Sequence, residues 1–267
     1  MKLAFIGGGV MGEAMMRGIL AKGLAMPQDI IVSDVDQERL SALSQCYGIR
    51  TSANSRQGVE GSEVIVIAVK PQNLAELMPE LEGRFAPGQL LLSIIAGAAI
   101  DTIAKGLGHD SVVRAMPNTP AQIGEGITVW TASSEVSQSQ KEMARSILGA
   151  LGREIYVPDE KYLDMATAVS GSGPAYIFLV MEALIDAAER IGLPREMAEE
   201  LVLGTVLGAA RLAQETGRHP MELREMVTSP GGTTAEGIFK LEEGGLRALL
   251  AGAVIAAYEK AKEVGGK

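Results

Sequence analysis

A glycine-rich turn near the first residue constrains the fold of this chain more than any other feature of its sequence. The stretch "LAFIGGGVMGEAMMRGIL" places Gly7, Gly9 and Gly12 in G-x-G-x-x-G spacing. The turn follows a short apolar run, Leu3–Ile6, and opens a helix-like stretch, which is the context that a dinucleotide-binding turn requires. Gly7 permits the tight turn, Gly9 lets the backbone approach a pyrophosphate, and Gly12 lets helix and strand pack closely. The alternative is an ordinary glycine-rich strand–helix turn.

The first part of the chain alternates between two kinds of segment. Short apolar runs that predict strands lie at Leu3–Ile6, Ile30–Ser33, Val64–Ala68, Leu90–Ile94, Val112–Ala115 and Gly126–Thr131. Helix-like stretches lie at Glu13–Ala25, Asp36–Tyr47, Asn73–Leu81 and Ile100–Leu107. Apolar strands that alternate with helices predict a largely parallel sheet covered on both faces, in which later strands can change direction.

From about Asp159 the strand pattern disappears. Helices are predicted at Tyr162–Val169, Ala175–Ile191, Arg195–Glu215, Met221–Val227, Thr234–Glu243 and Leu246–Val264. The fold class is therefore α/β, with an N-terminal Rossmann-like dinucleotide-binding domain over residues 1–158 and a C-terminal all-α domain over residues 159–267. With 47% apolar residues, a chain of 267 residues can bury the cores of two such domains.

Several predicted helices of the second half are apolar on more than one face, as in "LVLGTVLGAARLA". Such a helix must be buried on several sides. One small helical domain does not easily supply that cover, so we expect a dimerisation domain that interleaves with a second copy of the chain. The alternative is a helix at the centre of its own domain.

Composition excludes other classes. A net charge of −9 argues against a nucleic-acid or acidic-membrane partner. Cys46 is the single cysteine and is joined only by His109 and His219, so no metal site is predicted. No secretion signal precedes the first strand. The apolar stretch from Leu163 is interrupted by Asp164, two glycines and a proline, which makes it a poor membrane span, and we expect a soluble, cytoplasmic protein.

The end of the second predicted strand bears on the coenzyme. Asp34 lies 22 residues after Gly12, near where an acidic side chain accepts hydrogen bonds from the adenosine ribose. A carboxylate there favours NAD, because it repels a 2′-phosphate. Ser33 and Arg39 can accommodate that phosphate if Asp34 turns aside, so NADH and NADPH both stay open. Asp34 can also be a plain cap for the helix that starts at Asp36.

Two later segments follow strands at the same edge of the sheet. In "VIVIAVKPQ", Lys70 can reach a coenzyme phosphate or ribose, unless it is simply a solvated lysine that closes a strand. In "RAMPNTPAQIG", two prolines stiffen a loop around Asn118 and Thr119. We expect its amide and hydroxyl to be exposed and to line a nicotinamide pocket; a structural crossover between strands is the alternative.

The stretch "TSPGGTT", residues 228–234, interrupts the helices with a rigid, hydroxyl-rich turn. Its glycines expose backbone N–H groups, and Thr233 and Thr234 begin the next helix. Hydroxyls and free amides at a helix N-terminus form a nest for a carboxylate. A nicotinamide coenzyme implies hydride transfer, so this turn is predicted to bind the acceptor, a small acid. A simple helix–helix turn is the alternative.

The chain resembles the pyrroline-5-carboxylate reductase family over nearly its whole length. The resemblance is carried by "FIGGGVMG", "AVKP", "RAMPNTPA", "VSGSGPAY", "HPMELREMVTSPGGTT" and "LEEGGLRALL", in that order. It implies reduction of 1-pyrroline-5-carboxylate to L-proline by NADPH or NADH, the final step of proline biosynthesis. It also implies that Thr234 is the catalytic hydroxyl, a proton donor or polariser near the ring nitrogen. The substrate-binding residues that it implies are Ser229, Gly231, Gly232, Thr233 and Thr234.

The same resemblance implies a coenzyme site and an assembly. The implied coenzyme-binding residues, together with those argued above, are Ile6, Gly7, Gly8, Gly9, Val10, Met11, Gly12, Ser33, Asp34, Asn54, Ala68, Val69, Lys70, Pro71, Ile95 and Ala96. Members of the family form homodimers through interleaved helical domains, often assembled into decamers, with the site completed across the dimer. Members vary at the position of Asp34, so the choice between NADH and NADPH stays open.

Two rival functions remain. A hydroxyacid dehydrogenase combines similar halves but typically places a catalytic lysine on a helix of the substrate domain, and "ELVLGTVLGAARLAQETG" contains none. A non-catalytic nucleotide-sensing protein binds the coenzyme without oxidising it. Addition of pyrroline-5-carboxylate to the protein and a reduced coenzyme separates the three.

Overall fold

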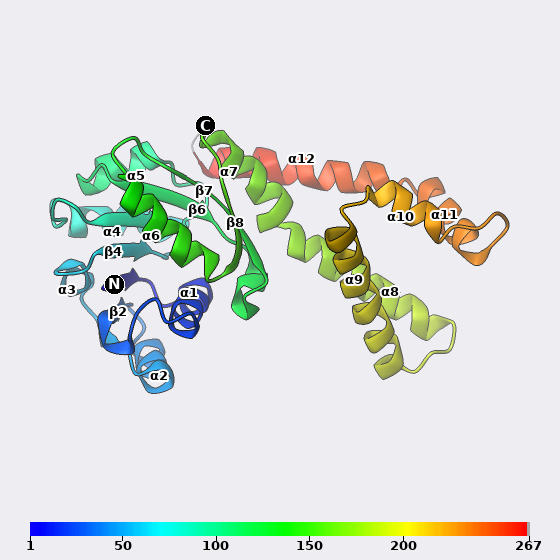
Figure 1. The fold of residues 1–267 in the computed structure, drawn as a ribbon, viewed down its shortest axis with the longest axis horizontal. Helices are drawn as coiled ribbons and strands as arrows, with labels where there is room; N and C mark the ends of the chain where they lie inside the picture. The colour runs from blue at the N-terminus through cyan, green and yellow to red at the C-terminus, as the bar shows by residue number, and fades with distance from the viewer. Residues whose placement is uncertain (266–267) are drawn as a thin grey trace. The chain divides into compact units, whose positions relative to one another are not determined.

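The structure is a computed structural model that describes residues 1–265 (Figure 1). The chain divides into two compact units. The first contains Met1–Ser172 together with the C-terminal segment from Ala257, and the second contains Gly173–Ala256. This division reflects packing within one chain; the domain boundary at residue 158 stays a prediction.

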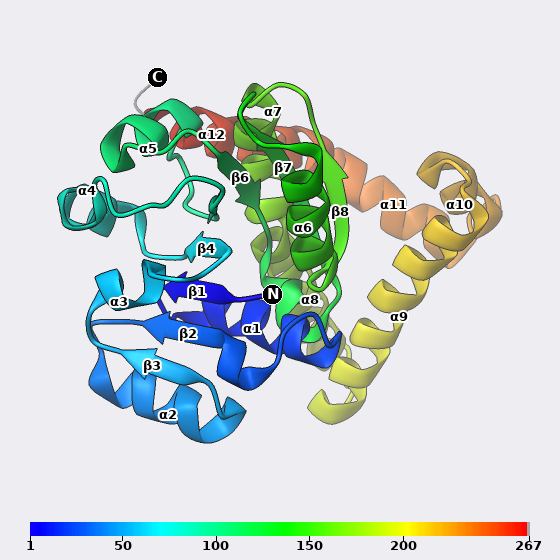
Figure 2. The ribbon, with the colours of Figure 1, turned by 60° about the vertical axis from the view of Figure 1, so that its left-hand side comes forward.

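The first unit is built on one sheet. Its strands are β1 (Leu3–Ile6), β2 (Ile30–Ser33), β3 (Arg50–Ser52), β4 (Val64–Ile67), β5 (Leu90–Ser93), β6 (Val112–Met116), β7 (Gly126–Ala132) and β8 (Gly152–Tyr156). The order is β3-β2-β1-β4-β5-β6-β7-β8, and all neighbours are parallel except β6 and β7. Figure 2 shows β3, β2, β1 and β4 side by side. The six predicted strands are confirmed to within one residue at each end, whereas β3 and β8 were not predicted.

Helices cover both faces of this sheet. They are α1 (Val10–Ala21), α2 (Gln37–Tyr47), α3 (Ser55–Val59), α4 (Leu74–Leu81), α5 (Ile100–Leu107), α6 (Gln138–Gly149) and α7 (Lys161–Ala166). Alternate strand residues enter opposite cores, because successive side chains of a strand point to opposite faces. In β4, Val64 and Val66 join a core with α1, α2 and α6, while Ile65 and Ile67 join one with α4 and α5. The doubly covered α/β sheet is thereby confirmed.

The second unit is helical. It contains α8 (Gly173–Arg190), α9 (Arg195–Thr216), α10 (Pro220–Met226), α11 (Thr233–Glu243) and most of α12 (Leu246–Val264). A π-helical turn, Thr167–Gly171, joins α7 to α8, so that Lys161–Arg190 forms one helix of 30 residues. Within this run the regular α-helix is nonetheless interrupted where the glycines and Pro174 were predicted to interrupt it, because the π-helical turn and a bend at Ser172 precede the start of α8 at Gly173. Pro174 lies in the first turn of α8, where a missing N–H leaves no intrahelical hydrogen bond unmade.

Few side chains of the second unit are buried. Ala198 and Val202 in α9 are buried, whereas α8, α11 and α12 have no buried residue. Large apolar side chains are exposed instead, including Phe178, Leu203 and Phe239. By length and composition alone, Lys161–Arg190 is the one helix within residues 1–265 that is long and apolar enough to cross a membrane. These helices therefore present apolar faces that the single chain does not cover.

Candidate active site

Two glycines of the first turn have no space for a side chain. Gly7 has φ +104°, in the region that favours glycine, and a Cβ there would lie 2.7 Å from the carbonyl oxygen of Ala68. A Cβ on Gly12 would lie 2.7 Å from the carbonyl oxygen of Gly7. The turn between β1 and α1 is therefore packed tightly against the end of β4.

Gly9 has a different environment. No atom lies within 4 Å of the position that its Cβ would take. Gly9 is also the N-cap of α1, no side chain caps that helix, and the residue borders a cavity. The uncapped N–H groups and the open space beside them fit the diphosphate of a dinucleotide, which helix N-termini bind well.

The cavity has a volume of about 440 Å³ and lies where β1, β2 and β4 end. Eight predicted coenzyme residues line it: Ile6, Gly7, Gly9, Ser33, Asp34, Ala68, Val69 and Lys70. The other eight, Gly8, Val10, Met11, Gly12, Asn54, Pro71, Ile95 and Ala96, do not. A larger hollow of about 770 Å³ beside α1 and α6 contains none of the predicted site residues.

The prediction missed half of the cavity lining. The additional lining residues are Val35, Ala53, Ser55, Gln72, Asn73, Glu76, Leu77 and Glu80. Several are direct neighbours of predicted positions. Asn73, Glu76, Leu77 and Glu80 are spaced i, i+3, i+4 and i+7, so they share one face at the start and along the length of α4. That periodicity was the signal available in the sequence.

Asp34 is fixed by the backbone around it. Its Oδ2 accepts the N–H of Gly8 at 2.7 Å, and its Oδ1 accepts the N–H of Asp36 at 3.0 Å. The cap of α2 is Asp36, whose carboxylate accepts the N–H of Arg39. The capping role considered for Asp34 therefore belongs to Asp36, and the Asp34 carboxylate lies at the cavity.

Arg39 is held by the glycine turn and by α1. Its Nε donates to the carbonyl oxygen of Gly8 at 2.6 Å, and its guanidinium pairs with Glu13, which also accepts the hydroxyl of Tyr47 at 2.8 Å. Burial alone would raise the pKa of Glu13, but the hydrogen bonds from Arg39 and Tyr47 outweigh it and keep that pKa below its ordinary value. Burial, and then the bond to Glu13, raise the pKa of Tyr47 to about 12.

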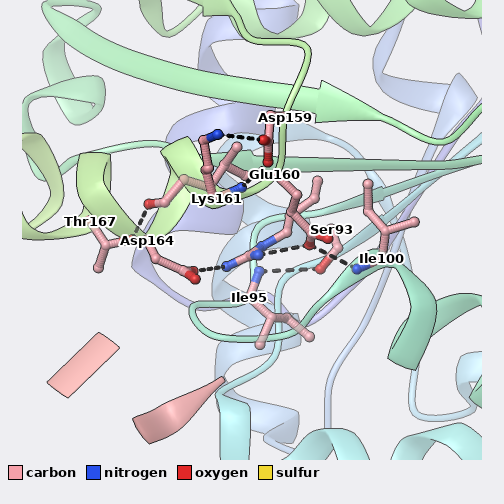
Figure 3. Close-up of polar contacts among 10 residues, drawn as sticks. Ser93, Ile95, Ile100, Asp159, Glu160, Lys161, Asp164 and Thr167 are labelled. Atoms are coloured by element: carbon pink, nitrogen blue, oxygen red, sulfur yellow. Dashed lines mark hydrogen bonds and ion pairs between the residues drawn. The ribbon is translucent and has the colours of Figure 1, made fainter. Parts of the chain in front are cut away.

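A polar network around Glu160 and Asp164, both labelled in Figure 3, organises the neighbouring edge of the sheet. Arg114 of β6 is 2% exposed and pairs with Glu160 at 2.7 Å and with Asp164 at 2.9 Å. Glu160 also accepts the N–H of Ile100, the first residue of α5, at 2.9 Å. This network fixes the end of the segment that carries Ile95 and Ala96. The sequence reading did not single out Arg114, because nothing in "RAMPN" distinguishes a buried arginine from an exposed one.

The loop between β6 and β7 differs from its prediction. Asn118 is buried, and its Oδ1 accepts the N–H of Ile127 at 2.9 Å, while Thr119 is exposed. The expectation that the Asn118 amide is exposed was wrong, because the amide satisfies the backbone at the start of β7. For Asn118 the alternative of a structural crossover is the better description.

The hydroxyl-rich turn lies in the second unit, between α10 and α11. Gly231 has φ +70°, and the N–H of Gly232 donates to the carbonyl oxygen of Ser229 at 3.0 Å. Helix α11 begins at Thr233, and no side chain caps its first turn. The side chains of Ser229, Thr233 and Thr234 are exposed in the single chain. Uncapped N–H groups beside three hydroxyls have the chemistry of a carboxylate nest.

The arrangement of the first unit defines a class of protein. The strand order reverses between β1 and β4, and the glycine turn and Asp34 meet at that switch point, where α/β folds bind dinucleotides. The chain is a nicotinamide-dependent oxidoreductase with an additional helical region.

Residues 160–264 match the family model described as pyrroline-5-carboxylate reductase dimerisation, and residues 2–97 match that of NADP oxidoreductase, coenzyme F420-dependent. The chain belongs to the pyrroline-5-carboxylate reductase family.

Individual relatives span the whole chain. The pyrroline-5-carboxylate reductase of Synechocystis is 42% identical over 266 residues, which cover 100% of this chain and 99% of the relative. The structure of a pyrroline-5-carboxylate reductase from Coxiella burnetii has 42% identity and a TM-score of 0.88, with 98% of each chain covered. That of Plasmodium falciparum pyrroline carboxylate reductase with NADP bound has 30% identity and a TM-score of 0.90, covering 99% of this chain and 98% of the other.

Proposed function

We propose that this chain reduces 1-pyrroline-5-carboxylate to L-proline with NADH or NADPH, the final step of proline biosynthesis. The observation that carries this proposal is the full-length identity with pyrroline-5-carboxylate reductases. The dinucleotide cavity of the first unit and the uncapped, hydroxyl-rich turn of the second support it.

In the proposed mechanism, the bound reduced nicotinamide supplies a hydride to the imine carbon. The backbone N–H groups at the start of α1 bind the diphosphate, and Asp34 accepts the ribose hydroxyls. Ser229 and the N–H groups of Gly231, Thr233 and Thr234 hold the substrate carboxylate, while the Gly232 N–H closes the turn on the carbonyl oxygen of Ser229. The Thr234 hydroxyl donates a hydrogen bond to the ring nitrogen and polarises the imine, and a proton from solvent, relayed through this hydroxyl, completes the amine of proline. A protonated cyclic imine is already a good hydride acceptor, so orientation contributes more than a strong general acid.

The assembly is part of this proposal. The helices of the second unit carry exposed apolar side chains over a region that matches the family's dimerisation model. We infer a homodimer that buries these faces, including that of Lys161–Arg190, and completes the site; assembly into a decamer is the higher-order form. The protein acts in the cytoplasm and binds neither nucleic acid nor membrane.

An absorbance assay tests the reaction. The purified protein is mixed with NADH or NADPH and then with pyrroline-5-carboxylate, a keto acid or buffer. The proposal predicts loss of reduced-coenzyme absorbance with pyrroline-5-carboxylate only, and formation of an equal amount of proline. Oxidation with the keto acid instead would support a hydroxyacid dehydrogenase, and coenzyme binding without oxidation would support a nucleotide sensor.

A further inference from the structure

We propose that this chain discriminates between the two nicotinamide coenzymes in favour of NADH, and that Asp34 is the residue that discriminates. This inference rests on the proposed function, because it concerns the coenzyme of the same reaction. NADPH differs from NADH by a phosphate on the 2′-oxygen of the adenosine ribose. Selection therefore depends on which charges surround that oxygen, at the end of β2.

Asp34 cannot readily turn away from the cavity. Both of its carboxylate oxygens accept backbone N–H groups, from Gly8 at 2.7 Å and from Asp36 at 3.0 Å. Rotation of the side chain would break both hydrogen bonds. Each oxygen keeps a further lone pair, so the carboxylate can still accept the ribose hydroxyls of NADH. A 2′-phosphate would place a second anion against the same group, and like charges in contact strongly oppose binding.

The positive charge nearest in sequence is already used. Arg39, on the first turn of α2, donates its Nε to the carbonyl oxygen of Gly8 at 2.6 Å and pairs with Glu13. Both backbone groups of Gly8 are thus hydrogen-bonded: its N–H donates to Asp34, and its carbonyl oxygen accepts from Arg39. To neutralise a 2′-phosphate, Arg39 would have to leave Glu13 and release the glycine turn.

The remaining charges of the cavity favour the same coenzyme. Besides Asp34, the charged residues that line it are Lys70, Glu76 and Glu80, so three of its four charged lining residues are acidic. Arg56 follows the lining residue Ser55, but its Nε donates to the carbonyl oxygen of Glu80 at 3.2 Å. The NADP-bound relative from Plasmodium falciparum is 30% identical to this chain. The preference is therefore assigned to the particular side chains of this chain and not to its family.

Binding constants test the proposal directly. The dissociation constants of NADH and NADPH are measured by nicotinamide fluorescence for the wild type and for Asp34→Asn, Asp34→Ser and Glu13→Ala. Glu38→Gln is the matched control, because Glu38 is an exposed residue of α2, four residues after Asp34, and its substitution removes one negative charge that does not line the cavity. Circular dichroism verifies that each variant is folded.

The wild type is expected to bind NADH at least about tenfold more tightly than NADPH. Asp34→Asn and Asp34→Ser are expected to reduce that ratio at least about fivefold by tightening NADPH, and Glu13→Ala is expected to tighten NADPH by releasing Arg39. The control keeps the wild-type ratio. Equal binding of the two coenzymes by the wild type, or an unchanged ratio in both Asp34 variants, overturns the proposal.

The same samples separate this inference from the proposed reaction. Each is also given pyrroline-5-carboxylate with saturating NADH. Tight NADH binding with no proline formed contradicts the proposed reaction and leaves the preference standing. If proline is formed but the wild type binds NADPH as tightly as NADH, the proposed reaction stands and the proposed coenzyme preference is contradicted.

Discussion

At the scale of single residues, the three glycines of the first turn have different tasks despite their regular spacing. Gly7 and Gly12 are required by the protein itself, because a Cβ on either would lie 2.7 Å from a backbone oxygen. Gly9 has no protein atom within 4 Å of its Cβ position and borders the cavity. Of the three, only Gly9 lacks a packing reason for being glycine, and we propose that the coenzyme diphosphate is the reason.

Alanine substitutions distinguish these tasks. Gly12→Ala is expected to lower the free energy of unfolding by about 1–3 kcal/mol, because the added methyl group overpacks the turn. Gly9→Ala is expected to leave stability within about 0.5 kcal/mol and to weaken coenzyme binding at least about tenfold, because its methyl group occupies the space of the diphosphate. Urea unfolding and coenzyme titration measure the two effects. A Gly9→Ala protein that binds coenzyme normally would contradict the assignment.

Thr234 is the residue on which the proposed chemistry depends. Thr234→Ala is expected to reduce turnover about 100-fold, because the imine nitrogen loses its hydrogen-bond partner. The affinity for NADH should change less than about twofold, since the coenzyme is bound by other residues. Thr234→Ser should restore most of the activity by keeping the hydroxyl. Thr216→Val, at an exposed threonine of α9, is the control. Wild-type turnover in Thr234→Ala would remove this hydroxyl from the mechanism.

Glu13 makes stability depend on pH. Its pKa in the folded chain lies below the ordinary value of 4.5, so its contribution is present above that pH and is lost as the pH falls through the lowered value. The wild type is therefore expected to be more stable than Glu13→Gln at about pH 7, and the difference should shrink toward about pH 3. Urea unfolding of both proteins across this range measures it. A difference that grows on acidification would show that the sign is wrong.

At the scale of elements, segments with a strong apolar pattern were predicted correctly as strands, whereas strands with a weak apolar pattern were missed. Strands such as Val64–Ile67 are buried on both faces and read as continuous apolar runs. In contrast, β3 has the sequence RTS and β8 has the sequence GREIY, and these are the two edge strands of the sheet. Pairing with a neighbouring strand, and not the strand preference of their own residues, makes these segments strands. The missed helix α6 did carry a signal, because Ser137 and Gln140 have the spacing of a capping box.

The capping box of α6 gives a prediction for that element. Ser137 accepts the N–H of Gln140, and the Gln140 side chain accepts the N–H of Ser137. Ser137→Ala is expected to lower the free energy of unfolding by about 1 kcal/mol. Ser146→Ala, at an exposed position inside the same helix, should change it by less than about 0.5 kcal/mol. Thermal unfolding measures both. Equal effects of the two substitutions would contradict the capping role.

At the scale of the whole molecule, the two halves of the candidate site were predictable to different degrees. The coenzyme half follows from local spacing, because a strand, a glycine turn and an acidic residue occur within about thirty-five residues of sequence. The substrate half needed family resemblance to assign Thr234 a role, since hydroxyls at a helix start are common. The apolar faces of the C-terminal helices predicted an interface with a second chain. The pattern of residues along one helix does not show which helices of the two chains contact each other.

A charge on the exposed apolar surface tests the inferred dimer. Leu203 of α9 is 53% exposed in the single chain. Leu203→Glu is expected to weaken dimerisation at least about tenfold, because a buried carboxylate without a partner is costly. Gln214→Glu adds the same charge at a polar, exposed position of α9 and should have little effect. Sedimentation velocity measures the assembly. An unchanged sedimentation coefficient for Leu203→Glu across a dilution series would place the interface elsewhere.

The central claim is that the coenzyme bound at the glycine turn and the acid bound at Ser229–Thr234 meet in one site. A crystal structure of the assembled protein with oxidised coenzyme and L-proline tests it most directly. The account predicts the proline carboxylate within hydrogen-bonding distance of Ser229 and the N–H groups of Thr233 and Thr234, with its ring against the nicotinamide. Proline bound elsewhere, with this turn empty and remote from the nicotinamide, would contradict it.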